Sequence, residues 1–147
     1  MPSPRRSPRR STRRTPRIEP LVRRPEVRDE QPPDDAALVI RGGLHSLDPE
    51  KVREACLDSM ADSGFYGVSV FAALDGDVAA LCARIDRLRS PGTIWVARCS
   101  DLRASGFDLL ATDAAPHYDV VLPDLAESTI DRVITCFDPR PNPLKQR

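Results

Sequence analysis

Residues 65–73 read FYGVSVFAA, in which aromatic and β-branched side chains surround Ser69. This composition predicts a β-strand. Side chains alternate between the two faces of a strand, so Ser69 and Phe71 are expected on one face and the valines on the other. Gly67 weakens a strand unless another group approaches its backbone closely, so this strand is also a candidate site.

The sequence on both sides of this strand alternates between helix and strand patterns. The expected helix signals are Pro49 to Gly64 with Ser46 or Asp48 as the cap, Asp77 to Leu88, Ser100 to Gly106, and a capping-box pair, Asp124 and Glu127, before the last helix. Strands are expected at residues 37–41, 93–97 and 118–122, and residues 107–111 fit either a strand or a helix extension.

This order of elements predicts an α/β or α+β domain, a single mixed sheet of four to five strands with three main helices. We expect a disordered tail over residues 1–36, one globular domain over residues 37–140, and an irregular C-terminal tail over residues 141–147, because three prolines end regular structure there. About 105 residues can bury one hydrophobic core. The glycine patterns of nucleotide-binding loops do not occur, which disfavours a doubly wound nucleotide-binding fold.

The charges divide the chain into two unlike parts. Its 147 residues carry 22 basic and 22 acidic side chains. Residues 1–28 hold ten arginines and two glutamates, a charge of +8, whereas residues 37–147 hold 12 basic and 16 acidic residues, a charge of −4. Only two basic residues are lysines, and the heavy use of Arg, Ala, Asp and Pro favours a GC-rich bacterial genome. With no apolar run of 18 residues and no signal-peptide core, we expect a cytoplasmic protein that does not enter a membrane.

The N-terminal tail has too few apolar residues to offset the entropy lost on folding. Its Ser-Pro-Arg-Arg repeats resemble the minor-groove-binding tails of chromatin proteins, so residues 1–28 predict a nucleic-acid partner. The arginines expected to contact nucleic acid are Arg5, Arg6, Arg9, Arg10, Arg13, Arg14 and Arg17. Three alternatives remain: a solvated extension, a mis-assigned start codon, and neutralisation by the nearby acids Asp29, Glu30, Asp34 and Asp35.

The four cysteines are Cys56, Cys82, Cys99 and Cys136. None forms a C-x-x-C pair and no histidine lies at ligand spacing, so no metal site is expected. Small buried thiols in a reducing cytoplasm explain them better.

Three patches are candidates for chemistry. Arg41 and His45 flank a Gly-Gly turn after the first strand, where a guanidinium can bind a phosphate or carboxylate. Tyr66 and Ser69 are polar groups on an aromatic-rich strand. Both of these patches also have a structural explanation. The first can be a turn with a paired arginine, and the second can be the polar face of a half-exposed strand.

The third patch is Pro-His-Tyr-Asp at residues 116–119, where His117, Tyr118 and Asp119 begin a strand. A histidine there can act as acid, base or anion ligand near neutral pH. The structural alternative is a loop histidine that hydrogen-bonds to solvent or backbone. We predict Arg41, Ser69 and His117 as catalytic residues and Arg41, His45, Tyr66, Tyr118 and Asp119 as binding residues.

The order of an apolar strand ending in Arg-Gly, then Gly-Val-Ser-Val-Phe, then His-Tyr-Asp resembles the ADP-ribosyltransferase superfamily and its small bacterial toxin branches. This resemblance implies NAD as the cofactor, Arg41 as its holder and Ser69 or Tyr66 at the nicotinamide pocket. The Glu-x-Glu or Gln-x-Glu pair of that family does not occur here. The pattern RGG, SVF, PHY-x-VVLPD and NP also resembles small actinobacterial proteins, which implies no activity.

Three hypotheses of function follow from these observations, the third of them an accessory domain with a dispensable tail. One is a toxin-like or defence-associated enzyme that transfers ADP-ribose or attacks nucleic acid. The alternative is a non-catalytic module that binds a protein partner and docks nucleic acid through its arginine-rich tail. The enzyme requires its candidate residues to line one cleft, whereas the module predicts that they scatter.

Overall fold

A computed structural model describes residues 25–40 and 47–145 of the chain. The strands are β1 (Val27–Arg28), β2 (Ala37–Ile40), β3 (Tyr66–Ala73), β4 (Thr93–Arg98), β5 (Asp108–Thr112), β6 (His117–Leu122) and β7 (Asp138–Pro141). The helices are α1 (Pro49–Ser63), α2 (Val78–Arg84), α3 (Cys99–Ala104) and α4 (Glu127–Thr135), with 3-10 turns η2 (Asp86–Leu88) and η3 (Pro143–Lys145).

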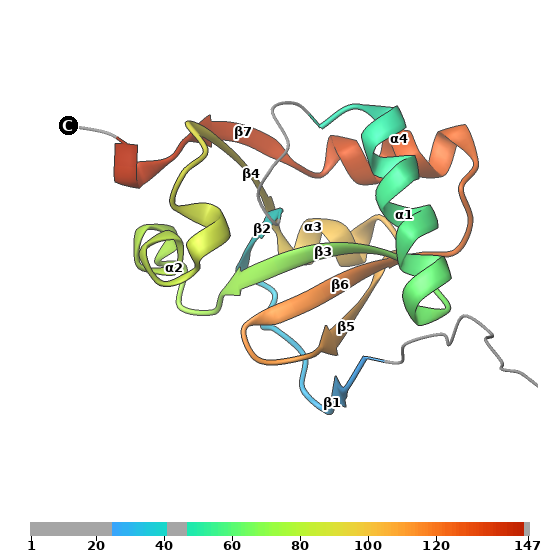
Figure 1. Ribbon diagram of the computed structural model, residues 1–147, viewed down its shortest axis with the longest axis horizontal. Coiled ribbons are helices and arrows are strands. Elements are labelled where there is room, and N and C mark those ends of the chain that lie inside the picture. The colour runs from blue at the N-terminus through green and yellow to red at the C-terminus, as the bar shows by residue number, and fades with distance from the viewer. Residues whose placement is uncertain (1–24, 41–46, 146–147) are drawn as a thin grey trace, which may run out of the picture.

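The strands form one sheet in the order β1-β5-β6-β3-β2-β4-β7, and every neighbouring pair is antiparallel. The fold is therefore α+β, and the predicted mixed sheet of four to five strands was wrong in both respects. Four α-helices lie in the described part of the chain: the three predicted main helices and the short helix predicted from Ser100, which is α3. In Figure 1, α1 and α4 lie side by side at one end of the sheet and α2 lies at the other.

The two strands that the sequence did not predict are both at the edges of the sheet. β7 has the sequence DPRP and pairs with β4 along residues 93–96. Proline cannot donate a ladder hydrogen bond, so it is tolerated only where one side of a strand is unpaired. After β7, Asn142 is fully buried and its amide donates to the carbonyls of Leu88 (2.7 Å) and Pro91 (2.8 Å). The predicted irregular tail from residue 141 is therefore corrected: the fold continues past β7.

The N-terminal boundary needs a similar correction, because residues 25–36 belong to the fold and not to a tail. β1 pairs with β5, and Ala36 is fully buried. The Gln31 amide donates to the Leu109 carbonyl (2.9 Å), and Arg103 pairs with Asp34 (2.6 Å). The remainder of the predicted tail, residues 1–24, lies outside the described residues.

The end signals of α1 are confirmed. The Asp48 side chain accepts from the Lys51 N–H, a proline opens the helix, and Gly64 ends it in the left-handed region (φ 88°). The capping-box prediction for α4 was wrong. Ala126 is its N-cap and makes no side-chain cap bond, while Asp124 closes the preceding turn by accepting from the Ala126 N–H (3.0 Å) and also accepts from the Thr129 hydroxyl in α4 (2.6 Å).

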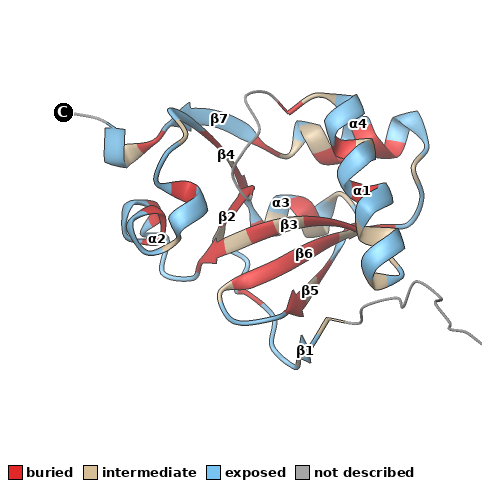
Figure 2. Cartoon of the chain, in the orientation of Figure 1, coloured by how far each residue is buried: buried red, intermediate tan, exposed pale blue. Residues whose placement is uncertain are grey.

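Two hydrophobic clusters lie on the sheet. The larger contains Val68, Val70 and Tyr118 and extends to α1, α3 and α4, and the smaller packs α2 against β2 and β4. Figure 2 shows the buried residues concentrated on the central strands, while β7 is exposed and β1 has no buried residue. Because α2 covers β2, β4 and the end of β3 around Phe71 and Ala73, the same face of the first part of β3, of β6 and of β5 is left for a pocket.

Gly67, near the start of β3, lies where neighbouring atoms leave no room for a side chain. A Cβ atom there would lie 2.7 Å from a Phe65 ring carbon, 3.0 Å from the Ser59 hydroxyl and 3.1 Å from an Asp119 carboxylate oxygen. Gly67→Ala is expected to lower the free energy of unfolding by about 1–3 kcal/mol, the usual cost of overpacking. Gly92→Ala is the matched control, since nothing lies within 4 Å of the added atom. Thermal unfolding of both variants tests this; equal melting temperatures would contradict it.

Candidate functional site

The register of β3 against β6 brings two of the predicted sites together. Ser69 pairs with Asp119 and Phe71 pairs with His117, so these four side chains share one face of the sheet. His117 and Asp119 are almost fully buried, at 9% and 8% exposure. Their neighbour on β5 is Thr112, which is fully buried.

Hydrogen bonds connect the polar side chains in a row. The Ser69 hydroxyl donates to Asp119 Oδ1 (3.3 Å), and the Thr112 hydroxyl donates to Asp119 Oδ2 (2.8 Å). His117 Nδ1 lies 2.9 Å from the Thr112 hydroxyl oxygen and 3.2 Å from the Thr112 carbonyl oxygen. Both carboxylate oxygens of Asp119 are thus occupied by hydroxyl donors.

These contacts define the tautomer of His117. A threonine hydroxyl has one proton, and here Asp119 accepts it. Both oxygens facing Nδ1 can therefore only accept, so Nδ1 carries the proton. In the neutral imidazole Nε2 is then an acceptor. Among the described residues, no hydrogen bond reaches Nε2.

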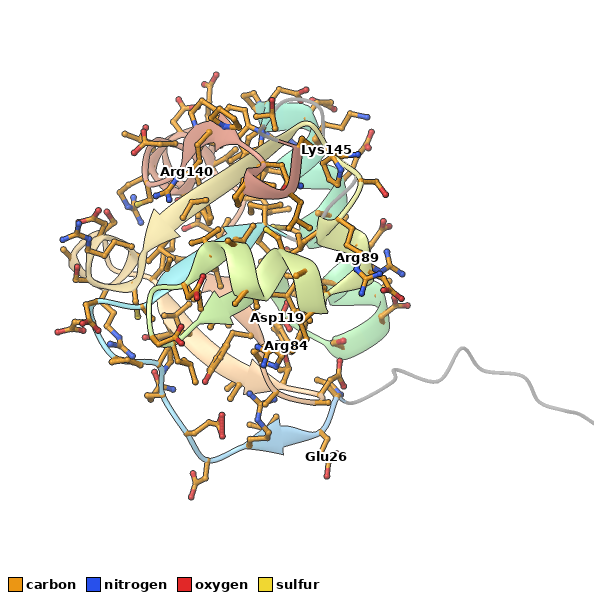
Figure 3. The ribbon with its side chains drawn as sticks, turned by 90° about the vertical axis from the view of Figure 1, so that its left-hand side faces the viewer. Glu26, Arg84, Arg89, Asp119, Arg140 and Lys145 are labelled. Atoms are coloured by element: carbon orange, nitrogen blue, oxygen red, sulfur yellow. The ribbon has the colours of Figure 1, made fainter. Side chains whose placement is uncertain are left out.

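His117, Ser69 and Asp119 open into a pocket of about 500 Å³. Its other walls come from the second half of α1, the start of β3, and single residues of the flanking segments. These residues are Pro25, Ile40, Ala55, Asp58, Ser59, Asp62, Ser63, Gly67, Val68, Arg87 and Asp113. Figure 3 views the molecule from the α2 side and labels Asp119 behind that helix.

The pocket is rich in hydrogen-bond acceptors and carries negative charge. Four aspartates and one arginine, Arg87, line it, which gives a net charge of −3 when His117 is neutral. Asp119 forms no ion pair with any described cation. A buried carboxylate of this kind is costly unless it is well hydrogen-bonded, and such groups concentrate at functional sites.

Arg28 holds the turn that presents His117. Its guanidinium donates to the carbonyls of Thr112 (2.9 Å), Asp113 and His117 (3.2 Å), and it lies over the Tyr118 ring, 5.3 Å from the centroid. Its hydrogen bond with Glu30 lowers the pKa of that carboxyl. Arg28 thus fixes the β5–β6 turn from the side opposite the pocket.

Cys56 on α1 lies close enough to Asp119 for its charge to matter. Burial raises the pKa of the Cys56 thiol to about 11, and the Asp119 charge adds to that rise. A pKa raised in the folded state gives stability that is present below the ordinary thiol value and is lost as pH rises through the folded value.

Cys56→Ala is therefore expected to flatten the loss of unfolding free energy between about pH 9 and pH 11, by at most about 1.4 kcal/mol per pH unit. Denaturant titrations across this range measure it. Cys136→Ala, which removes a half-buried thiol elsewhere in the fold, is measured beside it as the control for the loss of a thiol. Parallel slopes for the wild type and both variants would contradict the placement of Cys56.

Of the predicted site residues, the structure brings Ser69, His117 and Asp119 together. Tyr66 packs half-buried against the larger cluster, and Tyr118 lies on the opposite face, where its hydroxyl donates to Glu30 (3.2 Å). Neither tyrosine lines the pocket. Arg41, His45 and the tail arginines (Arg5, Arg6, Arg9, Arg10, Arg13, Arg14 and Arg17) lie outside the described residues.

Sequence reasoning missed Thr112, Arg28 and the two α1 aspartates, Asp58 and Asp62. The aspartates carried a usable signal, because they are four residues apart and so share one face of a helix. Thr112 carried none, since its role depends on the β5–β6 register. Arg28 was assigned to the tail.

Comparisons of this chain with known protein families, with curated proteins and with solved structures found no match. In the described part of the chain, no three His, Cys, Asp or Glu side chains gather to form a metal site. No described helix has the length and apolarity needed to cross a membrane.

Proposed function

We propose that this chain is an enzyme of glycosyl transfer, in which His117 removes a proton from the attacking nucleophile. The observation that carries the proposal is the Asp119–Thr112–His117 row, whose histidine lines an acidic pocket and has no hydrogen bond at Nε2 among the described residues. NAD is the substrate to test first, because the sequence resembles ADP-ribosyltransferases.

The charge of the pocket favours this chemistry over attack on nucleic acid. Cleavage of a glycosidic bond passes through a transition state with positive charge on the sugar, which nearby carboxylates stabilise. A polyanion entering a pocket of net charge −3 is repelled instead. Arg87 is the one described cation of the pocket and supplies a guanidinium for a diphosphate.

The step balances with water as the simplest nucleophile. The bond between the ribose carbon and the nicotinamide nitrogen breaks, and its electron pair leaves with nicotinamide. Water adds to the ribose carbon, and His117 Nε2 takes its proton. Asp119 and Thr112 keep Nδ1 protonated, so that Nε2 is the ring nitrogen that accepts this proton.

The purified protein is expected to release nicotinamide from NAD, either by hydrolysis or by transfer to an added amine or alcohol. Release measured by chromatography over hours, against a heat-denatured control, tests this. If the folded protein releases no more nicotinamide than the control, with or without added nucleophile, the proposed reaction is overturned.

A further inference from the structure

We propose that this pocket binds the chain's own arginine-rich N-terminal segment, with a guanidinium from residues 17–24 as its ligand. The inference does not rest on the proposed reaction, but the segment and a substrate would occupy the same pocket, so the segment would compete with a substrate for it.

The acceptors that line the pocket favour a cationic ligand with several N–H donors. Asp58 and Asp62 on the α1 wall and Asp113 at the β5–β6 turn are exposed acceptors. His117 is nine-tenths buried, and among the described residues its Nε2 has no donor. A guanidinium offers five N–H donors in a planar fork, which matches carboxylates and an imidazole acceptor better than a compact ammonium does.

The position of the segment supports the same ligand. The described chain begins at Pro25, and Pro25 itself lines the pocket. Arg23 and Arg24 directly precede it, and Arg17 is eight residues away, which an extended chain can span over about 28 Å. The chain length therefore allows an arginine of this segment to enter the pocket without a long loop.

The charges of the two parts are complementary. Residues 1–24 contain nine arginines and one glutamate, a charge of +8, while residues 25–147 contain 13 basic and 21 acidic residues, a charge of −8. A tethered ligand acts at a high effective concentration, so even weak ion pairs can hold it.

Trypsin digestion of the full chain tests this inference, because trypsin cleaves after Arg17 and Arg23. Asp58→Asn/Asp62→Asn is expected to speed these cleavages at least about threefold at low salt, the order expected for losing two exposed ion pairs. In 1 M salt, where the Debye length is about 3 Å, the wild type should match the variant. The cleavage rate of a free peptide of residues 11–28, measured at both salt concentrations, shows how salt changes the activity of trypsin itself.

Glu50→Gln/Glu54→Gln is the matched control, since it removes the same charge from exposed positions of α1 that do not line the pocket. It should leave the low-salt cleavage rate unchanged. All four substituted residues are exposed, so melting temperatures should differ little. If the pocket variant and the wild type are cleaved at the same rate, or the wild type is cleaved as fast as the free peptide at low salt, the inference is overturned. Both results are independent of nicotinamide release.

Discussion

Replacing His117 by asparagine is expected to lower nicotinamide release from NAD by about 10²- to 10⁴-fold, the usual contribution of a general base. Asparagine places an amide N–H close to the position of Nδ1, so the donor to Thr112 is kept. The acceptor Nε2 is lost. The variant thus removes the proton acceptor while retaining the hydrogen bond that positions it.

The stability of this variant must be separated from its activity. The His117 ring makes an edge-to-face contact with Phe71, with ring centroids 5.4 Å apart, and such a contact contributes about 0.5–1.5 kcal/mol. Phe71→Leu removes the same contact and leaves the imidazole in place. It is expected to lose comparable stability and to keep activity within a few-fold of the wild type. A His117→Asn enzyme as active as Phe71→Leu would show that His117 is not the base.

Replacing Thr112 by valine is expected to reduce both stability and activity. Thr112 is fully buried, and its hydroxyl bonds to both Asp119 and His117. Valine has nearly the same shape but leaves one carboxylate oxygen of Asp119 without a donor, at a cost of about 1–3 kcal/mol. With only a backbone carbonyl holding Nδ1, the imidazole is less well oriented, and activity should fall about 10- to 100-fold.

Thr112→Ser is the matched control, because it keeps the hydroxyl and removes only a methyl group. It should lose about 1 kcal/mol of stability and retain most of the activity. The two variants are compared by denaturant unfolding and by nicotinamide release. If serine and valine at this position give equal activity, Thr112 has no role in positioning His117.

The central part of the fold could be predicted because its elements carry local signals. β3 and β6 are runs of aromatic and β-branched residues, and α1 has a capping aspartate, a first-turn proline and a terminal glycine. The edge strands carry no such signal: β1 has two residues and β7 has the sequence DPRP. Tertiary contacts determine the pairing of these two edge strands. For this reason the sequence could not predict the number of strands or the domain boundaries.

The candidate site could be predicted in part for the same reason. Ser69 and His117 stand out as polar groups on apolar strands, but only the antiparallel register shows that Asp119 lies opposite Ser69. Tyr66 and Tyr118 lie an odd number of residues from Ser69 and His117, so alternation along each strand places them on the other face. That rule was available from sequence and argues against Tyr118 as a pocket residue.

The protonation of the His117 ring is the most direct test of the proposed site. Nitrogen NMR of the imidazole at about pH 8, where an ordinary histidine is neutral, distinguishes a protonated ring nitrogen from an unprotonated one. The chain has only two histidines, so the spectrum of His117→Asn assigns the signals. We predict a proton on Nδ1 and none on Nε2. A His117 ring with its proton on Nε2 would contradict the account, because no acceptor would then face the pocket.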